Sequence, residues 1–175
     1  MECGDHLLST CTGLWQDIIR EHFAHPLNDV IKEMVFVLNK YLLPPVKFTA
    51  DLGSYTFPQH IVSTDLRPDM VWWNDSSRTI VILELTIPFE TSFQLACERK
   101  TIKYESLVKR ARENGYSAKF ISLEVGSRGI VNLPSFHYLK DLLKISSCDY
   151  KNLLIKVASV AIRGSHKIWC SRNRQ

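Results

Sequence analysis

The spacing of apolar residues along the chain predicts several amphipathic helices. Between residues 27 and 42, apolar side chains recur at helical spacing, and this helix should end before Pro44-Pro45. The same spacing predicts helices over residues 92–114, within residues 133–145 and over residues 150–162. Ser92 is a candidate N-cap and Gly115 a candidate C-terminal stop for the second helix.

Short apolar runs between these helices predict strands. Residues 67–73 and 79–87 are expected to be strands, joined by a turn rich in Asn, Asp and Ser. Residues 118–125 predict another strand, and residues 46–56 a strand or hairpin arm. The run before Glu84 is almost continuously apolar, as in a central strand covered on both faces. We therefore expect an α/β sandwich with a mixed central sheet flanked by helices.

Composition bounds the class of protein more than its function. The chain has 175 residues, of which 45% are hydrophobic and 23% charged, as expected for one folded domain. The net charge of +4 permits a nucleic-acid partner without requiring one. No apolar run could span a bilayer, and the first residues lack the features of a signal peptide. Five scattered cysteines favour a reducing, intracellular compartment over a disulfide framework.

Two carboxylates interrupt the apolar pattern of the predicted hairpin. Asp69 lies at the start of the first strand and Glu84 near the end of the second, so an antiparallel pairing would bring them side by side. Strand alternation places Glu84 on one sheet face with Ile82 and Thr86. A buried carboxylate is costly without a cation, so the pair predicts a site for Mg²⁺ or Mn²⁺.

A metal bound to this pair would need further oxygen ligands, and the backbone carbonyl of Leu85 and water molecules could supply them. Such a metal could activate water and stabilise charge on a phosphoryl group. Each carboxylate also has a structural interpretation. Asp69 could be a strand-edge residue after Pro68, and Glu84 a core carboxylate paired with Lys or Arg.

The predicted helix over residues 92–114 carries two lysines near its apolar stripe. On a helical wheel Lys100 falls inside the stripe and Lys103 on its rim. One interpretation directs an ammonium group at Asp69 and Glu84, where it would position water or neutralise a phosphate. The other is a long side chain that covers apolar surface and keeps its charge in water.

The order of these residues resembles the signature of PD-(D/E)XK nucleases. Pro68-Asp69 is followed by Glu84-Leu85-Thr86, with Thr86 where the motif lysine would stand. In several branches of that superfamily the lysine has moved to the following helix.

More narrowly, the chain resembles the restriction-like endonuclease of non-LTR retrotransposons. This resemblance rests on residues 84–90, 99–100, 103–104 and 125–129, and it covers residues 27–129. It implies a restriction-endonuclease-like fold and a metal-dependent DNA endonuclease, which nicks target DNA so that the 3′ end primes reverse transcription. It also implies a reverse transcriptase module as partner and a nuclear location. The oligomeric state, a homodimer included, stays open.

The resemblance implies roles for particular residues. Asp69 and Glu84 would be the metal ligands, Lys100 or Lys103 the migrated lysine, and Tyr104 an accessory catalytic residue. It further implies that Arg99, Lys100 and Arg128 contact DNA.

The ends of the chain lie outside the predicted nuclease-like domain of residues 25–163. The basic tail over residues 164–175 offers Lys167 as a contact to the phosphate backbone, although a solvated, partly disordered tail is the alternative. In the extension over residues 1–24, Cys3, His6 and Cys11 resemble part of a Cys/His zinc motif. A tetrahedral zinc site needs four ligands, so the missing fourth ligand favours a remnant over a zinc site.

Two other functions remain open. Thr86 cannot replace the motif lysine chemically, so the chain could be a catalytically inactive nucleic-acid-binding or interaction module on the same fold. It could also be a nuclease of the same superfamily that acts on RNA or on branched DNA.

Overall fold

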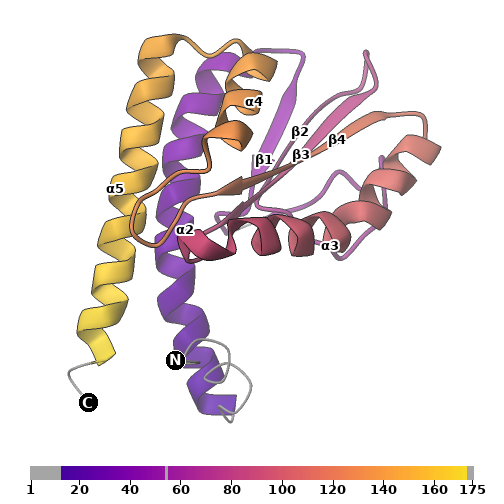
Figure 1. Ribbon diagram of the computed structural model, residues 1–175. Helices are drawn as coiled ribbons and strands as arrows, with labels where there is room; N and C mark the ends of the chain where they lie inside the picture. The colour runs from indigo at the N-terminus through magenta and orange to yellow at the C-terminus, as the bar shows by residue number, and fades with distance from the viewer. Residues whose placement is uncertain (1–12, 54, 173–175) are drawn as a thin grey trace.

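The computed structural model describes residues 13–53 and 55–172, with side chains described for residues 27–53 and 55–170 (Figure 1). It is an α/β structure built on a mixed sheet of four strands. In chain order the elements are α2 (Gly13–Tyr41), β1 (Lys47–Ala50), β2 (Met70–Asn74), β3 (Thr79–Thr86), the 3-10 helix η1 (Glu90–Ser92), α3 (Phe93–Glu113), β4 (Ser117–Glu124), α4 (Leu133–Leu143) and α5 (Ser147–Arg172).

The sheet combines an antiparallel meander with one parallel pair. Its strand order is β1-β2-β3-β4, in which β1, β2 and β3 pair antiparallel and β3 pairs parallel with β4. A parallel pair needs a long crossover, and α3 supplies it. The chain therefore leaves β3 beyond Thr86, crosses one face of the sheet as α3, and returns as β4.

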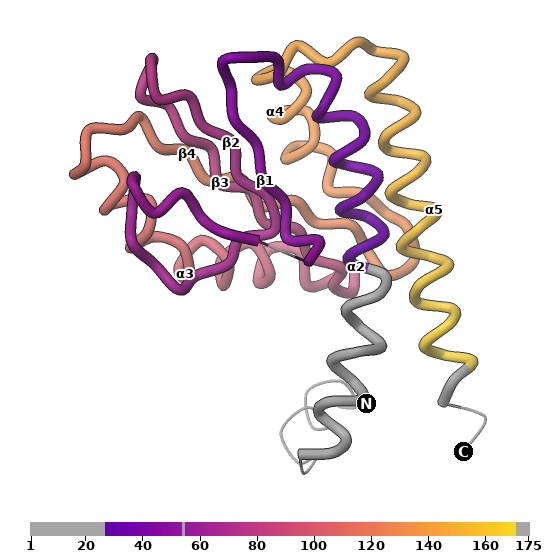
Figure 2. The backbone as a smooth tube through the Cα atoms, turned by 180° about the vertical axis from the view of Figure 1, so that it is seen from behind, coloured from indigo at the N-terminus to yellow at the C-terminus, as the bar shows by residue number. Residues whose placement is uncertain are grey.

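Helices cover both faces of the sheet, and each face has its own apolar core. Helices α2, α4 and α5 pack on the face that carries Val81, Leu83 and Leu85, whereas α3 packs on the face that carries Ile80 and Ile82. Figures 1 and 2 show α2 and α5 side by side. In the described part of the chain, no helix is long and apolar enough to cross a membrane.

The predicted elements agree with this fold apart from their ends. The α/β class, the mixed sheet and the flanking helices are confirmed. Gly115 has a φ of 82°, as the C-terminal stop of α3 requires, but the Ser92 side chain makes no capping hydrogen bond. Strand β2 begins at Met70 instead of residue 67. Helix α5 continues to Arg172, so residues 164–172 of the predicted tail are helical.

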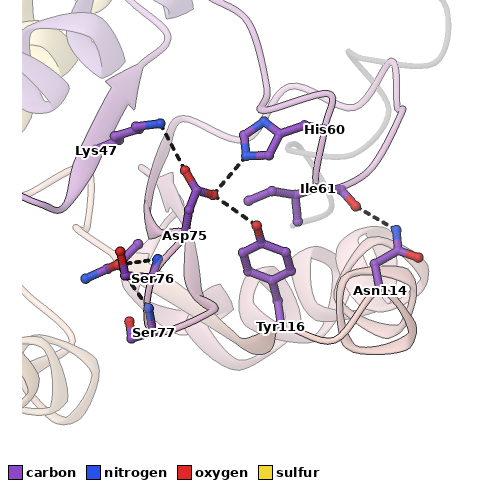
Figure 3. Close-up of polar contacts among 9 residues, drawn as sticks. Lys47, His60, Ile61, Asp75, Ser76, Ser77, Asn114 and Tyr116 are labelled. Carbon is purple, nitrogen blue, oxygen red and sulfur yellow. Dashed lines mark hydrogen bonds and ion pairs between the residues drawn. The ribbon is translucent and has the colours of Figure 1, made fainter.

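A polar cluster closes the sheet at the β2–β3 turn (Figure 3). Asp75 in this turn accepts hydrogen bonds from Lys47 of β1 at 2.9 Å and from Tyr116 before β4 at 2.9 Å, and lies 2.9 Å from the His60 ring. The bonds from His60 and then Lys47 hold the pKa of Asp75 well below its usual range. This end of the hairpin is thus fixed by a carboxylate whose charge is satisfied, opposite the end that carries Asp69 and Glu84.

Candidate functional site

Three carboxylates follow one another across neighbouring strands at the other end of the hairpin. Ala50 pairs with Met70, and Met70 with Leu83. One residue further along, Asp51, Asp69 and Glu84 are therefore cross-strand neighbours, and their side chains share the sheet face that α3 covers. We call these residues the carboxylate row.

Hydrogen bonds lock Asp69 and Glu84 together. The Asp69 amide donates to Glu84 Oε2 at 3.2 Å, and the Leu85 amide donates to Asp69 Oδ2 at 2.7 Å. These bonds continue the β2–β3 ladder beyond its last backbone pair. In a strand, the carbonyl of a residue points to the same edge as its amide, so the Leu85 carbonyl points toward Asp69.

Two lysines of α3 point at the same oxygen of Glu84. Lys100 Nζ lies 2.5 Å from Oε1, and Lys103 Nζ lies 3.7 Å from it. The Lys100 side chain is 28% exposed and that of Lys103 45%, whereas that of Glu84 is only 3% exposed. Lys100 is therefore the closer and better shielded partner, and a buried pair of this kind is hard to break because the remaining charge would be left unpaired.

The negative charge of Asp69, the second carboxylate of the pair, is compensated less completely than that of Glu84. Burial, and then the negative charge of Glu84, raise the pKa of Asp69 to about 7. Asp69 Oδ1 accepts no hydrogen bond from any side chain or backbone group in the described ranges. This oxygen is the open position of the site.

Tyr104 lies on the buried side of the site, next to Glu84. Its side chain is fully buried, stacks on Phe120 with ring centroids 5.5 Å apart, and donates a hydrogen bond to the Arg67 carbonyl at 3.1 Å. Burial, followed by the charge of Glu84, raises the pKa of the Tyr104 hydroxyl. Lys103 Nζ lies 4.6 Å from the centre of the Tyr104 ring. These contacts fit a residue that positions Lys103 and the segment before Asp69.

A fourth carboxylate, which the sequence analysis did not identify, lies on the same sheet face. Glu124 is fully buried at the end of β4, beside Thr86 of β3. Ser122 donates to one of its oxygens, and Asn132, the residue before α4, donates to the other at 2.7 Å. Glu124 therefore connects the start of α4 to the sheet by hydrogen bonds. A negative charge is favourable at this position because the N-terminus of a helix carries a partial positive charge. Thr86 Oγ1, beside it, is buried without a hydrogen-bond partner among the described residues.

The residues predicted to bind DNA are not all brought to the site. Arg99 is exposed on α3, one residue from Lys100. Arg128 is exposed but forms an ion pair with Glu90 at 2.9 Å. Lys167 lies on α5, which packs on the opposite face of the sheet from α3.

The predicted zinc ligands Cys3, His6 and Cys11 lie outside the described residues. The structure therefore tests neither a zinc site nor a remnant of a Cys/His zinc motif in this segment.

Two side chains at the edge of the site were missed by the sequence analysis. Arg67 donates to Asp51 at 2.6 Å, and its guanidinium lies 5.7 Å from the centre of the Tyr55 ring. The Asp51 amide in turn donates to the Asp69 carbonyl at 2.8 Å, so this group adjoins the carboxylate row. These residues reach the site through the pairing register of β1 with β2. Strand β1 is so short that its alternation of apolar residues does not predict this register.

The donors at the carboxylate row suit a hard divalent cation such as Mg²⁺ or Mn²⁺. Asp69 Oδ1 has no partner among the described residues, and the Leu85 carbonyl faces the β2 side of β3. A cation would offset the negative charge of Glu84, which after burial is the main cause of the raised pKa of Asp69. Among the described residues, no group of three or more Asp, Glu, His or Cys is arranged to hold a metal. A metal here would therefore depend on Asp69 and Glu84, with the carbonyl and water completing its shell.

Comparison with known proteins adds no family to this description. A search against protein-family models gives no match, and a search of curated proteins gives no match. The nuclease interpretation therefore depends on the motif residues and their geometry.

We expect Asp69 to make the metal-free protein less stable as the pH rises. Its pKa is raised in the folded state, so its stabilising contribution is present below its unfolded-state pKa of about 4 and is lost as the pH passes through about 7. Asp69→Asn should therefore gain thermal stability relative to wild type between about pH 5 and about pH 8, measured in EDTA.

Asp149→Asn is the matched control. Hydrogen bonds from Tyr41 and then Lys40 hold the pKa of Asp149 below its usual range, so its titration lies below this window. An Asp69→Asn protein with the same pH dependence as wild type would contradict the raised pKa.

Proposed function

We propose that this protein is a divalent-metal-dependent endonuclease that hydrolyses phosphodiester bonds in DNA. The observation that carries the proposal is that three residues converge on one point. They are Asp69, which directly precedes β2, Glu84 of β3 and Lys100 of α3. Three separate elements supply two carboxylates and a cation there. A purely structural ion pair would need only one carboxylate and one cation.

Within this proposal each residue has a physical task. Asp69 and Glu84 would hold the cation, and the Leu85 carbonyl would add a neutral oxygen. The bound Mg²⁺ or Mn²⁺ supplies Lewis-acid activation of water and of the phosphoryl group. The amide of Asp69 holds Glu84, and the amide of Leu85 holds Asp69, so neither carboxylate has to be reoriented before the reaction.

Lys100 takes the place of the motif lysine in this proposal. Thr86 is uncharged and its hydroxyl can only exchange hydrogen bonds, so it cannot stabilise a phosphate as an ammonium group does. Lys100 reaches the same site from α3 and lies 2.5 Å from Glu84. Its positive charge would be placed to neutralise the phosphate or to position the attacking water.

The same proposal includes the particular fold, the mode of DNA cleavage, the partner and the location in the cell. The order β-meander, helix, parallel strand, with the carboxylates at one end of β2 and β3, supports a restriction-endonuclease-like fold. The resemblance to retrotransposon endonucleases then suggests nicking of target DNA, a reverse transcriptase module as partner and a nuclear location.

A catalytically inactive nucleic-acid-binding module is the second candidate. One observation favours it: both oxygens of Glu84 and one of Asp69 already have partners within the protein. In that case Lys100 would be a permanent structural partner of Glu84, and the site would hold no cation.

A nicking assay on supercoiled plasmid with Mn²⁺ separates the two candidates. Wild type should cut, and Asp69→Asn and Glu84→Gln should each cut about 100-fold more slowly or not at all, because a metal centre contributes several kcal/mol to the rate. Asp75→Asn, which alters a carboxylate at the other end of the same hairpin, should cut as wild type does. Failure of wild type to cut, or full activity in both site variants, would contradict the nuclease.

The two lysines should differ in their contributions. Lys100→Met should lower kcat by roughly 100-fold, the loss typical of one charged group aimed at the reacting centre. Lys103→Met should have the smaller effect, since Lys103 is farther from Glu84 and more exposed. Lys109→Met, an exposed position on the same helix, is the control for loss of charge. Equal effects of all three changes would remove Lys100 from the mechanism.

A further inference from the structure

A buried hydroxyl without a partner lies next to the carboxylate row. Tyr55 Oη is shielded from solvent and forms no hydrogen bond with any described residue. A phenolic hydroxyl is both a donor and an acceptor, and burying it unpaired costs free energy. Such a group calls for a ligand or a functional explanation.

Its surroundings place Tyr55 at the site. Burial, and then the negative charges of Asp51, Glu84 and Asp69, raise the pKa of the hydroxyl, while the positive charge of Arg67 lowers it. The contacts place it there as well: Arg67 lies over the Tyr55 ring and donates to Asp51, and the Asp51 amide donates to the Asp69 carbonyl. The hydroxyl stays protonated at neutral pH. A protonated hydroxyl here can donate a hydrogen bond.

The ring of Tyr55 is held by its neighbours while its hydroxyl is left unpaired. The Arg67 guanidinium lies against the ring at 5.7 Å and is itself fastened by Asp51. The ring also packs against the apolar core under α3. The orientation of the hydroxyl is therefore fixed before any ligand arrives, which lowers the entropic cost of binding one.

The charges around this hydroxyl suit an anionic ligand with acceptor oxygens. When all groups are ionised, the three negative charges of the carboxylate row are balanced by three positive charges, those of Lys100, Lys103 and Arg67. A divalent cation at Asp69 and Glu84 would leave an excess of positive charge, which attracts a phosphate.

We propose that Tyr55 is a substrate-contacting residue, whose hydroxyl donates a hydrogen bond to a non-bridging oxygen of a DNA phosphate bound beside Asp69 and Glu84. This inference rests on the proposed nuclease function and adds a residue that the nuclease motif does not contain. Tyr55 belongs to the segment between β1 and β2, whereas Lys100 and Lys103 belong to α3, so the phosphate would be contacted from two separate parts of the chain.

Tyr150 provides a matched control within the same chain. Its hydroxyl is also buried without a described partner, but it lies in the core between the sheet and α5, on the other sheet face. Tyr55→Phe and Tyr150→Phe each remove one unpaired hydroxyl and no hydrogen bond. Neither change should lower the thermal stability of the free protein.

The test combines DNA binding with cleavage. Binding of a short fluorescein-labelled DNA duplex is measured by anisotropy in Ca²⁺, and nicking of plasmid in Mn²⁺. Tyr55→Phe should bind or cut about 10- to 100-fold less well than wild type, the range for one hydrogen bond to a charged group. Tyr150→Phe should match wild type in both assays.

The outcomes distinguish this inference from the nuclease proposal. If wild type cuts and Tyr55→Phe matches it in both assays, only the role of Tyr55 is overturned. If wild type binds the duplex without cutting, the nuclease proposal fails and the binding assay alone decides for or against Tyr55. A loss of thermal stability in Tyr55→Phe, or no binding and no cutting by wild type, would overturn the inference.

Discussion

The buried contact between Lys100 and Glu84 is the interaction on which the site depends. Strand pairing places Asp69 beside Glu84 on a covered sheet face, where the two negative charges repel each other and both carboxylates are largely removed from solvent. Lys100 compensates one charge, whereas the Asp69 carboxylate accepts a hydrogen bond only from the Leu85 amide among the described residues, and burial and then the charge of Glu84 raise its pKa. In our proposal a divalent cation would offset the remaining charge, and this links the fold to the proposed chemistry.

The rest of the structure holds that end of the sheet in place. Helix α3 runs from β3 back to β4, so the crossover that parallel pairing requires also delivers Lys100 and Lys103 to Glu84. Tyr104 joins this helix to the Arg67 carbonyl just before Asp69. At the far end of the hairpin Asp75 makes its own set of polar contacts, which fixes the register without involving the site.

Much of this could be predicted from the sequence because it follows from local periodicity. The alternation around Glu84 gave its sheet face, the helical wheel gave the inward position of Lys100, and the hairpin turn brought Asp69 beside Glu84. Features that depend on non-local register could not be predicted. Asp51 joins the carboxylate row only because short β1 pairs with β2, and the unpaired Tyr55 hydroxyl depends on how the β1–β2 connection crosses the sheet.

The central claim is that Asp69 and Glu84 form a metal site, and Mn²⁺ binding followed by electron paramagnetic resonance tests it most directly. Wild type should bind Mn²⁺ at a saturable site, and Asp69→Asn should lose that binding. Asp75→Asn should retain it, because its carboxylate lies at the other end of the hairpin. Saturable binding that survives in Asp69→Asn, or no saturable binding by wild type, would contradict the account.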